Sequence, residues 1–450
     1  MRVLTTTVSA LACAALAATA SAQNATQPAP LQLSIGEAIT RGLEQSPRVA
    51  EARAKETGAA AAVTARKVQE KPDVTALASY LRTNHVEDFG VRQPDGSTLV
   101  IFPDVPNNYR VRAQVTVPIY TGGRVDAQVR SAEREELAVT ADREAVEDEV
   151  TLDLTRAYWG LVTSRERVAV LEQALVRADA VVNDVRARLD AGVVPPNELL
   201  SAQAQRARQS VQLIQARRDA VMAEVTLGRL LGLPPDTPIT PTTPVSQPTP
   251  GAADLIAQPV PTLVARAREI RPERRGLLQR QDSYRISAQA SLANLKPRFD
   301  ALASVEPSRP NTRFVPRTDE WRLGWDIGGT LSWPLWDGGR ARATSAQALA
   351  QAEAVTHRIR EFDAALSIDV RQRVLDVEAS RAALDASDQA VAAAAEARRV
   401  VEERFSVGVA TSTEVLDAQL KLIEAELERT QLLAGLRVDE ARLVRAVGGL

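Results

Sequence analysis

The sequence is poor in the residue types that most catalytic and metal sites need. Its 450 residues include one cysteine, Cys13, and two histidines, His85 and His357. A single cysteine excludes an internal disulfide, and so few thiols and imidazoles exclude the usual clusters of transition-metal ligands. The sequence also lacks a glycine-rich phosphate loop, a nucleophile elbow and a histidine-centred triad. We therefore expect no enzyme activity, no cofactor and no bound metal.

An excess of charge and long apolar runs are also missing. Lys and Arg together number 55 and Asp and Glu 57, so the charge balance gives no indication of nucleic acid as a partner. Beyond the N-terminal segment, no run approaches the roughly 18 consecutive apolar residues that a membrane-spanning helix needs. If the chain contacts a membrane, we expect it to do so through strands.

The first residues have the features of a secretory signal. Arg2 precedes an apolar run from Val8 to Ala18, and Ala20 to Ala22 forms a small-residue cleavage site. A short buried helix is the alternative, but the polar segment that follows favours export. Residues 1–22 are therefore predicted to be a signal peptide.

The most informative feature of the sequence is an internal repeat. Residues 117–124 read VPIYTGGR, and residues 333–340, 216 positions later, read WPLWDGGR. Upstream the offset is 225, so the first copy carries nine more residues, between Ser79 and Val117. Two constant offsets separated by one insertion indicate an internal duplication. Each copy has a strand-ending proline and a double-glycine turn, at Pro118, Gly122 and Gly123 and again at Pro334, Gly338 and Gly339.

Four segments are predicted to be strands. Apolar and polar residues alternate with a period of two over about 109–119 and about 321–335. Because the offset of 216 is even, the same face is apolar in both copies. The preceding segments, about 73–82 and about 298–306, complete two hairpins.

The length and ends of these strands favour a membrane. A strand of about 10 residues, tilted by about 45°, spans the apolar band of a bilayer. Aromatic residues at strand ends are typical of a membrane interface, and here they are Tyr120, Trp321, Trp333 and Trp336. The face of a soluble β-sandwich is the alternative. Since a closed barrel needs at least about 8 strands, four strands per chain predict a symmetric oligomer, and three chains would supply twelve.

Helical patterns fill most of the remaining sequence. They cover about 35–71, 123–190 and 198–231 in a first repeat (23–232) and about 262–294, 339–406 and 413–447 in a second repeat (262–450), with a proline-rich connection, 233–261, between them. Apolar residues recur at steps of three and four from Leu154 to Leu189, as in helices that pack side by side. The long helices reverse at Gly192 and Gly408, because glycine adopts the left-handed conformation that ends a helix.

This order of elements resembles the TolC-like outer-membrane efflux proteins over essentially the whole mature chain. Residues 405–408 (FSVG) followed by 413–419 (TEVLDAQ) are similar to the family's helix-hairpin signature, and residues 189–203 form a weaker copy. The resemblance implies a mainly α-helical fold with a membrane β-barrel part. In that family a homotrimer joins a twelve-stranded barrel in the Gram-negative outer membrane to a twelve-helix tunnel across the periplasm.

The resemblance also implies a function and sites. The chain would be the passive exit duct of a tripartite efflux or type I secretion system, set in outer-membrane lipid and docked on a periplasmic adaptor and an inner-membrane transporter. The residues that match family sites are the adaptor-docking tips, Gly192, Val193, Gly408 and Val409, and the acidic entrance positions, Glu414 and Asp417.

The sequence departs from the family pattern at one place and leaves two alternatives open. Phe405 and Ala410 occupy positions at which family members with a described lock have tyrosine and arginine, so that latch is not expected here. Glu414 and Asp417 could instead belong to a solvated helix face. For the whole chain, the alternative function is a secreted or surface coiled-coil adhesin or scaffold without transport activity.

Overall fold

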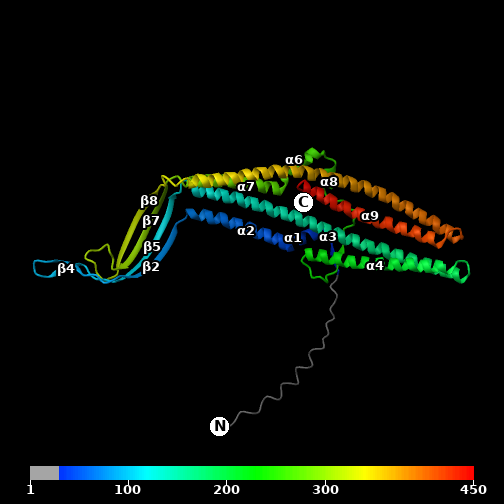
Figure 1. Cartoon of the computed structure of the whole chain (residues 1–450), viewed down its shortest axis with the longest axis horizontal. Coiled ribbons are helices and arrows are strands. Elements are labelled where there is room, and N and C mark those ends of the chain that lie inside the picture. Colours follow the sequence, from blue (N-terminus) through cyan, green and yellow to red (C-terminus); the bar gives the residue numbers. More distant parts are fainter. Residues whose placement is uncertain (1–29, 450) are drawn as a thin grey trace, which may run out of the picture.

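The chain folds into a long bundle of helices that carries a sheet at one end (Figure 1). This computed structural model describes residues 30–449, so the predicted signal peptide lies outside the described residues. In Figure 1 the longest helices run from the sheet to two hairpins at the opposite end. The molecule is therefore a rod whose two ends present different surfaces.

Helices make up most of the rod, and the two halves of the chain match in length. They are α1 (Ile35–Gln45), α2 (Pro47–Lys67), η1 (Val68–Glu70), α3 (Arg124–Asp190), α4 (Pro196–Leu230), α5 (Ala252–Ile256), α6 (Val260–Ile270), α7 (Pro272–Ala293), α8 (Arg340–Ser406) and α9 (Ser412–Ala446). Helices α3 and α8 both have 67 residues, and α4 and α9 both have 35. At 1.5 Å per residue, each long helix spans about 100 Å.

Two helices that the sequence pattern predicts as continuous are each broken in two. In place of one helix over about 35–71 the chain forms α1 and α2, and in place of one over about 262–294 it forms α6 and α7. The breaks fall just before Pro47 and Pro272, where the preceding residue has an extended ψ of 121° or 122°. A proline disfavours the helical conformation of the residue before it and is itself well suited to the first position of a helix.

A four-stranded antiparallel sheet forms the other part of the rod. Its strands are β2 (Asp73–Arg82), β5 (Asn107–Tyr120), β7 (Arg298–Arg309) and β8 (Arg322–Ser332), and they lie side by side in that order. The central pair, β5 and β7, joins the two predicted hairpins into one sheet. Strands β2 and β8 form its edges, so among residues 30–449 each has a strand partner on one side only.

The structure has two small sheets that the sequence pattern did not predict. The connection from β2 to β5 forms a hairpin of β3 (Phe89–Arg92) and β4 (Thr98–Phe102), which extends beyond the main sheet (Figure 1). This connection contains the nine additional residues of the first copy. Near the middle of the rod, β1 (Leu31–Leu33) pairs in parallel with β6 (Ile239–Pro241).

The double-glycine turns connect the sheet to the long helices. Gly122 and Gly123 have φ of 67° and 77°, and Gly338 and Gly339 have φ of 71° and 87°. Only glycine adopts this left-handed region at low cost. A Cβ on Gly122 would also lie 2.9 Å from the Cβ of Lys296, so this position is crowded as well.

The prolines of these turns differ in position between the copies. Pro118 still belongs to β5, at the point where the register between β5 and β7 becomes irregular. Pro334 lies beyond the end of β8. Only the second proline therefore follows its strand, which corrects the expectation that both end one.

The helices pack around several buried clusters of apolar side chains, with α3 in contact with α2, α4, α7 and α9. The largest fully buried side chain is that of Tyr158 on α3. Its hydroxyl donates to the carbonyl of Leu33 (3.1 Å) and accepts from the N–H of Thr243 (3.0 Å). Tyr158 thereby joins β1 and the proline-rich connection to the long helix.

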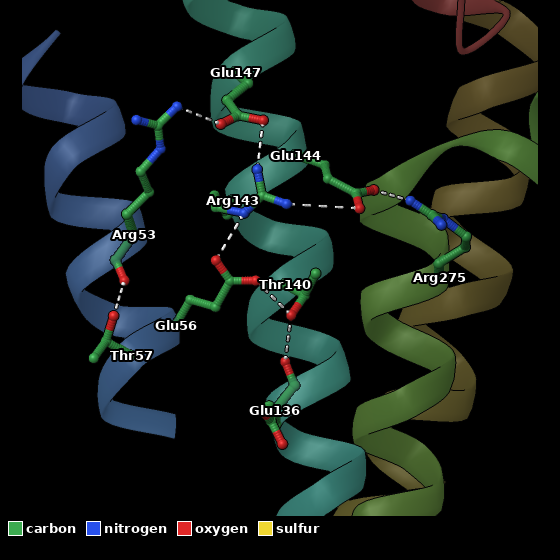
Figure 2. Close-up of polar contacts among 9 residues, drawn as sticks. All are labelled: Arg53, Glu56, Thr57, Glu136, Thr140, Arg143, Glu144, Glu147 and Arg275. Atoms are coloured by element: carbon green, nitrogen blue, oxygen red, sulfur yellow. Dashed lines mark hydrogen bonds and ion pairs between the residues drawn. The ribbon is translucent and has the colours of Figure 1, made fainter. Parts of the chain in front are cut away.

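A network of charged side chains connects α2, α3 and α7 (Figure 2). Arg143 on α3 pairs with Glu147 (2.6 Å) and with Glu56 on α2 (2.9 Å), and it also lies within 4.0 Å of Glu144. Glu144 in turn pairs with Arg275 on α7. Because Arg143 has a partner on α2 and Glu144 has one on α7, the network links the three helices.

Candidate functional site: hairpin tips and sheet faces

Two helical hairpins form the end of the rod that lies away from the sheet. Gly192 (φ 71°) follows α3 and Gly408 (φ 79°) follows α8. The N–H of the next residue donates to the carbonyl of Arg188 (2.8 Å) or Arg404 (2.9 Å), which closes a Schellman motif. A Cβ on either glycine would meet no atom within 4 Å, so glycine is required by the backbone conformation and not by crowding.

Each tip presents an apolar side chain. Val193 and Val409, which follow the glycines, are 68% and 66% exposed. The returning helices begin at Pro196 and Ser412, with Pro195 and Thr411 as N-caps. The sequence pattern predicted starts at about 198 and 413, and the first helix begins two residues earlier because proline suits the first position of a helix.

Polar contacts that the sequence pattern did not indicate tie one tip to the other. Arg188 on α3 donates from Nη1 to the carbonyl of Phe405 (3.0 Å), and its guanidinium lies 4.0 Å from the centre of the Phe405 ring. Ser412 Oγ donates to Glu198 Oε2 (2.7 Å), and the Ser412 side chain is fully buried. We call Arg188, Phe405, Glu198 and Ser412 the tip clamp.

The tip clamp surrounds an apolar contact between the two hairpins. Phe405 and Ala410 are both buried there, together with Val185, Ala202 and Val415. Phe405 and Ala410, which occupy the latch positions, thus form part of an apolar interface. The polar links between the hairpins run from Arg188 to the carbonyl and ring of Phe405 and from Ser412 to Glu198.

The two acidic residues predicted for the entrance lie next to the tip on α9. Glu414 and Asp417 are both exposed, whereas Val415 and Leu416 between them are buried. The N–H of Glu414 donates to Thr411 Oγ1 (3.3 Å), so Glu414 also belongs to the first turn of the helix. Both carboxylates thus lie on the face of α9 that the single chain leaves open.

One face of the sheet is apolar across all four strands. Residues directly opposite each other in the register point to the same side, as in the row Val74, Val115, Ala303 and Ile327. Large apolar side chains on this face are solvent-exposed; Trp325 is 66% and Ile327 78% exposed. So wide an exposed apolar surface is typical of a membrane or protein interface.

The opposite face of the sheet is mainly polar and charged. Arg112 donates to Ser304 (3.2 Å), Ser304 donates to Asp326 (2.8 Å), and Arg110 pairs with Glu306 (3.3 Å). These bonds connect β5, β7 and β8 across the strands. The two faces therefore differ as sharply as the lipid side and the water side of a membrane barrel.

Aromatic residues lie at both ends of the strands. Tyr120, Trp333 and Trp336 are exposed at the end nearest the helices, where Trp333 Nε1 donates to the carbonyl of Leu295 (3.1 Å). Trp321 lies at the opposite end, with its ring centre 6.1 Å from that of Tyr109. At about 3.3 Å per residue, a tilted strand of this length spans an apolar band about 25 Å tall.

Among residues 30–449, we find no helix with the length and apolar character that crossing a bilayer requires.

Known structures share this architecture. The outer membrane protein VceC from Vibrio cholerae superposes with a TM-score of 0.72 at 19% identity, over 92% of this chain and 96% of its own. The open state of the Neisseria gonorrhoeae outer membrane channel MtrE gives a TM-score of 0.73 at 18% identity, over 92% of this chain and 89% of its own. This chain therefore shares its fold with these two outer-membrane proteins.

The sequence comparison identifies the family. The model of the outer membrane efflux protein family matches residues 38–233 and again residues 263–449. The outer membrane efflux protein BepC of Brucella suis is 27% identical over 346 residues, which are 75% of this chain and 72% of BepC. The chain belongs to the outer membrane efflux protein family, and its place is the Gram-negative outer membrane.

Proposed function

We propose that three copies of this chain form the outer-membrane exit duct of a tripartite efflux or type I secretion system. The observation that carries the proposal is the sheet, which has one apolar face, one charged face and two open edges. In lipid an open edge leaves backbone groups without partners, so strands must close into a barrel. Four strands are too few, and three chains supply twelve around one axis.

The internal repeat allows the contact between copies to be written residue by residue. Strand β8 is equivalent to β5 at an offset of 216, and β7 is equivalent to β2 at 225. The contact of β2 with β8 of the next copy should therefore repeat the contact of β7 with β5. Since Ser304 lies opposite Gln114, this rule places Ser79 opposite Thr330 of the next copy.

Cysteine cross-linking tests this assembly. Cβ atoms of directly opposite residues lie about 4.5–5.5 Å apart, close to the separation that a disulfide bridges. Ser79→Cys in one chain and Thr330→Cys in a co-expressed chain with a different tag should yield a dimer that carries both tags. Leu331→Cys, one residue along and on the opposite face, is the matched control. If Ser79→Cys cross-links equally to Thr330→Cys and to Leu331→Cys, or to neither, the proposed closure of the barrel is contradicted.

The tips and the acidic pair complete the proposed duct. The exposed Val193 and Val409 would contact a periplasmic adaptor, which couples the duct to an inner-membrane transporter. Glu414 and Asp417 of three copies would form an acidic ring at the entrance. If the tips dock as proposed, Val193→Asp with Val409→Asp should leave trimers intact and abolish export in cells. Normal export by that variant would place docking elsewhere.

The charged face of the sheet and the helices would line one continuous passage. The duct itself makes and breaks no bond, and its relatives are channel proteins, so energy for transport would come from the inner-membrane partner. An adhesin or scaffold would use the long helices, but it would not need an apolar sheet face with aromatic residues at both ends of its strands. The exit duct is therefore the function that fits both ends of the molecule.

A further inference from the structure

The hairpin between β2 and β5 carries an apolar face that is exposed in the single chain. Phe89 lies opposite Phe102, with ring centres 6.2 Å apart, and Val91 lies opposite Leu99. The register shifts by one residue after Phe89, so both pairs of side chains share one face of the hairpin. They are 59%, 40%, 52% and 45% exposed, in that order. An isolated two-stranded hairpin is at best marginally stable in water, so this face needs a partner.

One strand of the hairpin, β4, already has a partner within the chain. The N–H of Arg317, in the connection between β7 and β8, donates to the carbonyl of Ile101 on β4 (3.0 Å). The Arg317 guanidinium also lies 5.0 Å from the centre of the Phe102 ring. Both contacts are made to β4, which leads into β5, the strand that pairs with β7. Strand β3 follows the open edge strand β2 and has no such contact among residues 30–449.

The arrangement of strands determines what approaches the β3 side. Under the proposed closure, on which this inference rests, β8 of the next copy lies beside β2. The next copy's connection between β7 and β8 then reaches the β3 side, just as the chain's own connection reaches the β4 side. That connection exposes Phe314 and Val315, the latter 69% exposed.

The charges of the two segments are complementary. Residues 83–106 contain four acidic residues and one arginine. The connection from β7 to β8, residues 310–321, contains two arginines and two acidic residues, and Arg309 and Arg322 at its two ends make the segment basic. The acidic hairpin is attracted by this basic segment and repelled by an anionic lipid surface. We propose that the β3–β4 hairpin is an intersubunit contact at the outer mouth, in which Phe89 and Val91 pack on Phe314 and Val315 of the next copy.

Cross-linking between two differently tagged chains tests the contact in the assembled protein. Val91→Cys in one chain and Val315→Cys in the other should give a dimer that carries both tags. Thr98→Cys, on the opposite face of the same hairpin, is the control and should cross-link to Val315→Cys at least tenfold less. Val91, Thr98 and Val315 are all exposed, so the variants are expected to fold as the parent does.

The pair Ser79→Cys and Thr330→Cys separates the two possible failures. If it cross-links while Val91→Cys with Val315→Cys does not, the barrel closes but the hairpin contact is wrong. Disulfides between two copies of Val91→Cys would mean that the hairpins meet on the axis, which also overturns the proposal. If neither pair reacts, the assembly itself is wrong and the hairpin contact falls with it.

Discussion

The carboxylate of Asp148 on α3 is poorly accommodated in the folded chain. Burial, reinforced by the nearby negative charge of Glu273, raises the pKa of Asp148 to about 6 from its usual 3.8, although Arg445 and Arg271 oppose the shift. A raised carboxyl pKa means that ionisation costs stability above pH 6. That cost disappears as the pH falls from about 6 to about 4, because the folded state then binds the proton more tightly than the unfolded state.

Asp148→Asn should therefore stabilise the protein at pH 7 and have little effect near pH 4. The two-unit shift corresponds to about 3 kcal/mol, which solvent screening reduces to about 1–2 kcal/mol. Thermal unfolding of the purified variant and parent at both pH values measures the difference. An identical change in melting temperature at the two pH values would contradict this assignment of the pKa.

Ser412 gives a second test at the residue scale, because it holds the tip clamp. A hydrogen bond to a charged group contributes about 1.5–3 kcal/mol, so Ser412→Ala should let the two hairpins separate. Spin labels at Val193→Cys and Val409→Cys should then report a longer and broader distance distribution. Ser406→Ala is the control, since that hydroxyl donates only to the carbonyl of Glu403 within its own helix. Unchanged distances in Ser412→Ala would mean that this hydrogen bond does not hold the two hairpins together.

The sequence identified the tip glycines but not the contacts between the tips. Gly192 and Gly408 stand out because a helix pattern stops at each of them and both obey the offset of 216. Ser412 and Glu198 are 214 positions apart, and no local pattern indicates that they meet. Contacts of this kind depend on how two hairpins pack, which periodicity within one helix does not encode.

At the scale of single elements, the sheet has the clearest consequences. Strands β5 and β8 were predictable because their alternation has a period of two and recurs at a fixed offset, and β2 and β7 were predicted as the preceding strands of two hairpins. The β3–β4 hairpin was not predicted, since it lies in an insertion with no second copy for comparison. The breaks before Pro47 and Pro272 were also missed, because the apolar pattern continues across both prolines.

The two faces of β8 should respond differently to the same added charge. Ile327→Arg places a cation on the apolar face, where it costs about 2–4 kcal/mol near the middle of a bilayer. Thr330→Arg places it on the charged face and should be tolerated. The amount of trimer extracted from outer membranes compares the two variants. Equal assembly would mean that the apolar face does not contact lipid.

At the scale of the whole molecule, the acidic pair on α9 concerns how ions enter the proposed duct. Glu414 and Asp417 are three residues apart and lie on one exposed face, so three copies would place six carboxylates at one level. Such a ring favours cations. The single chain leaves this face open, so its position relative to a lumen depends on the other two copies and could not be predicted from one sequence.

Replacing both carboxylates by amides tests the ring. In planar bilayers under a salt gradient, Glu414→Gln with Asp417→Asn should move the reversal potential toward zero and weaken block by divalent cations. Glu424→Gln, an exposed acid farther from the tip on α9, is the control for a general change in surface charge. An unchanged reversal potential in the double variant would place the carboxylates in water outside the tunnel.

The central claim is that the charged face of the sheet lines a conducting passage and that the apolar face contacts lipid. Single-channel recording after modification of cysteines with a maleimide-linked polymer tests it most directly. Modification of Thr330→Cys, on the charged face, should reduce the conductance of each channel step, because the polymer then occupies the passage. Modification of Ile327→Cys, three residues away on the apolar face, should leave the conductance unchanged. The reverse pattern, or a purified protein that forms no channels, would contradict the account.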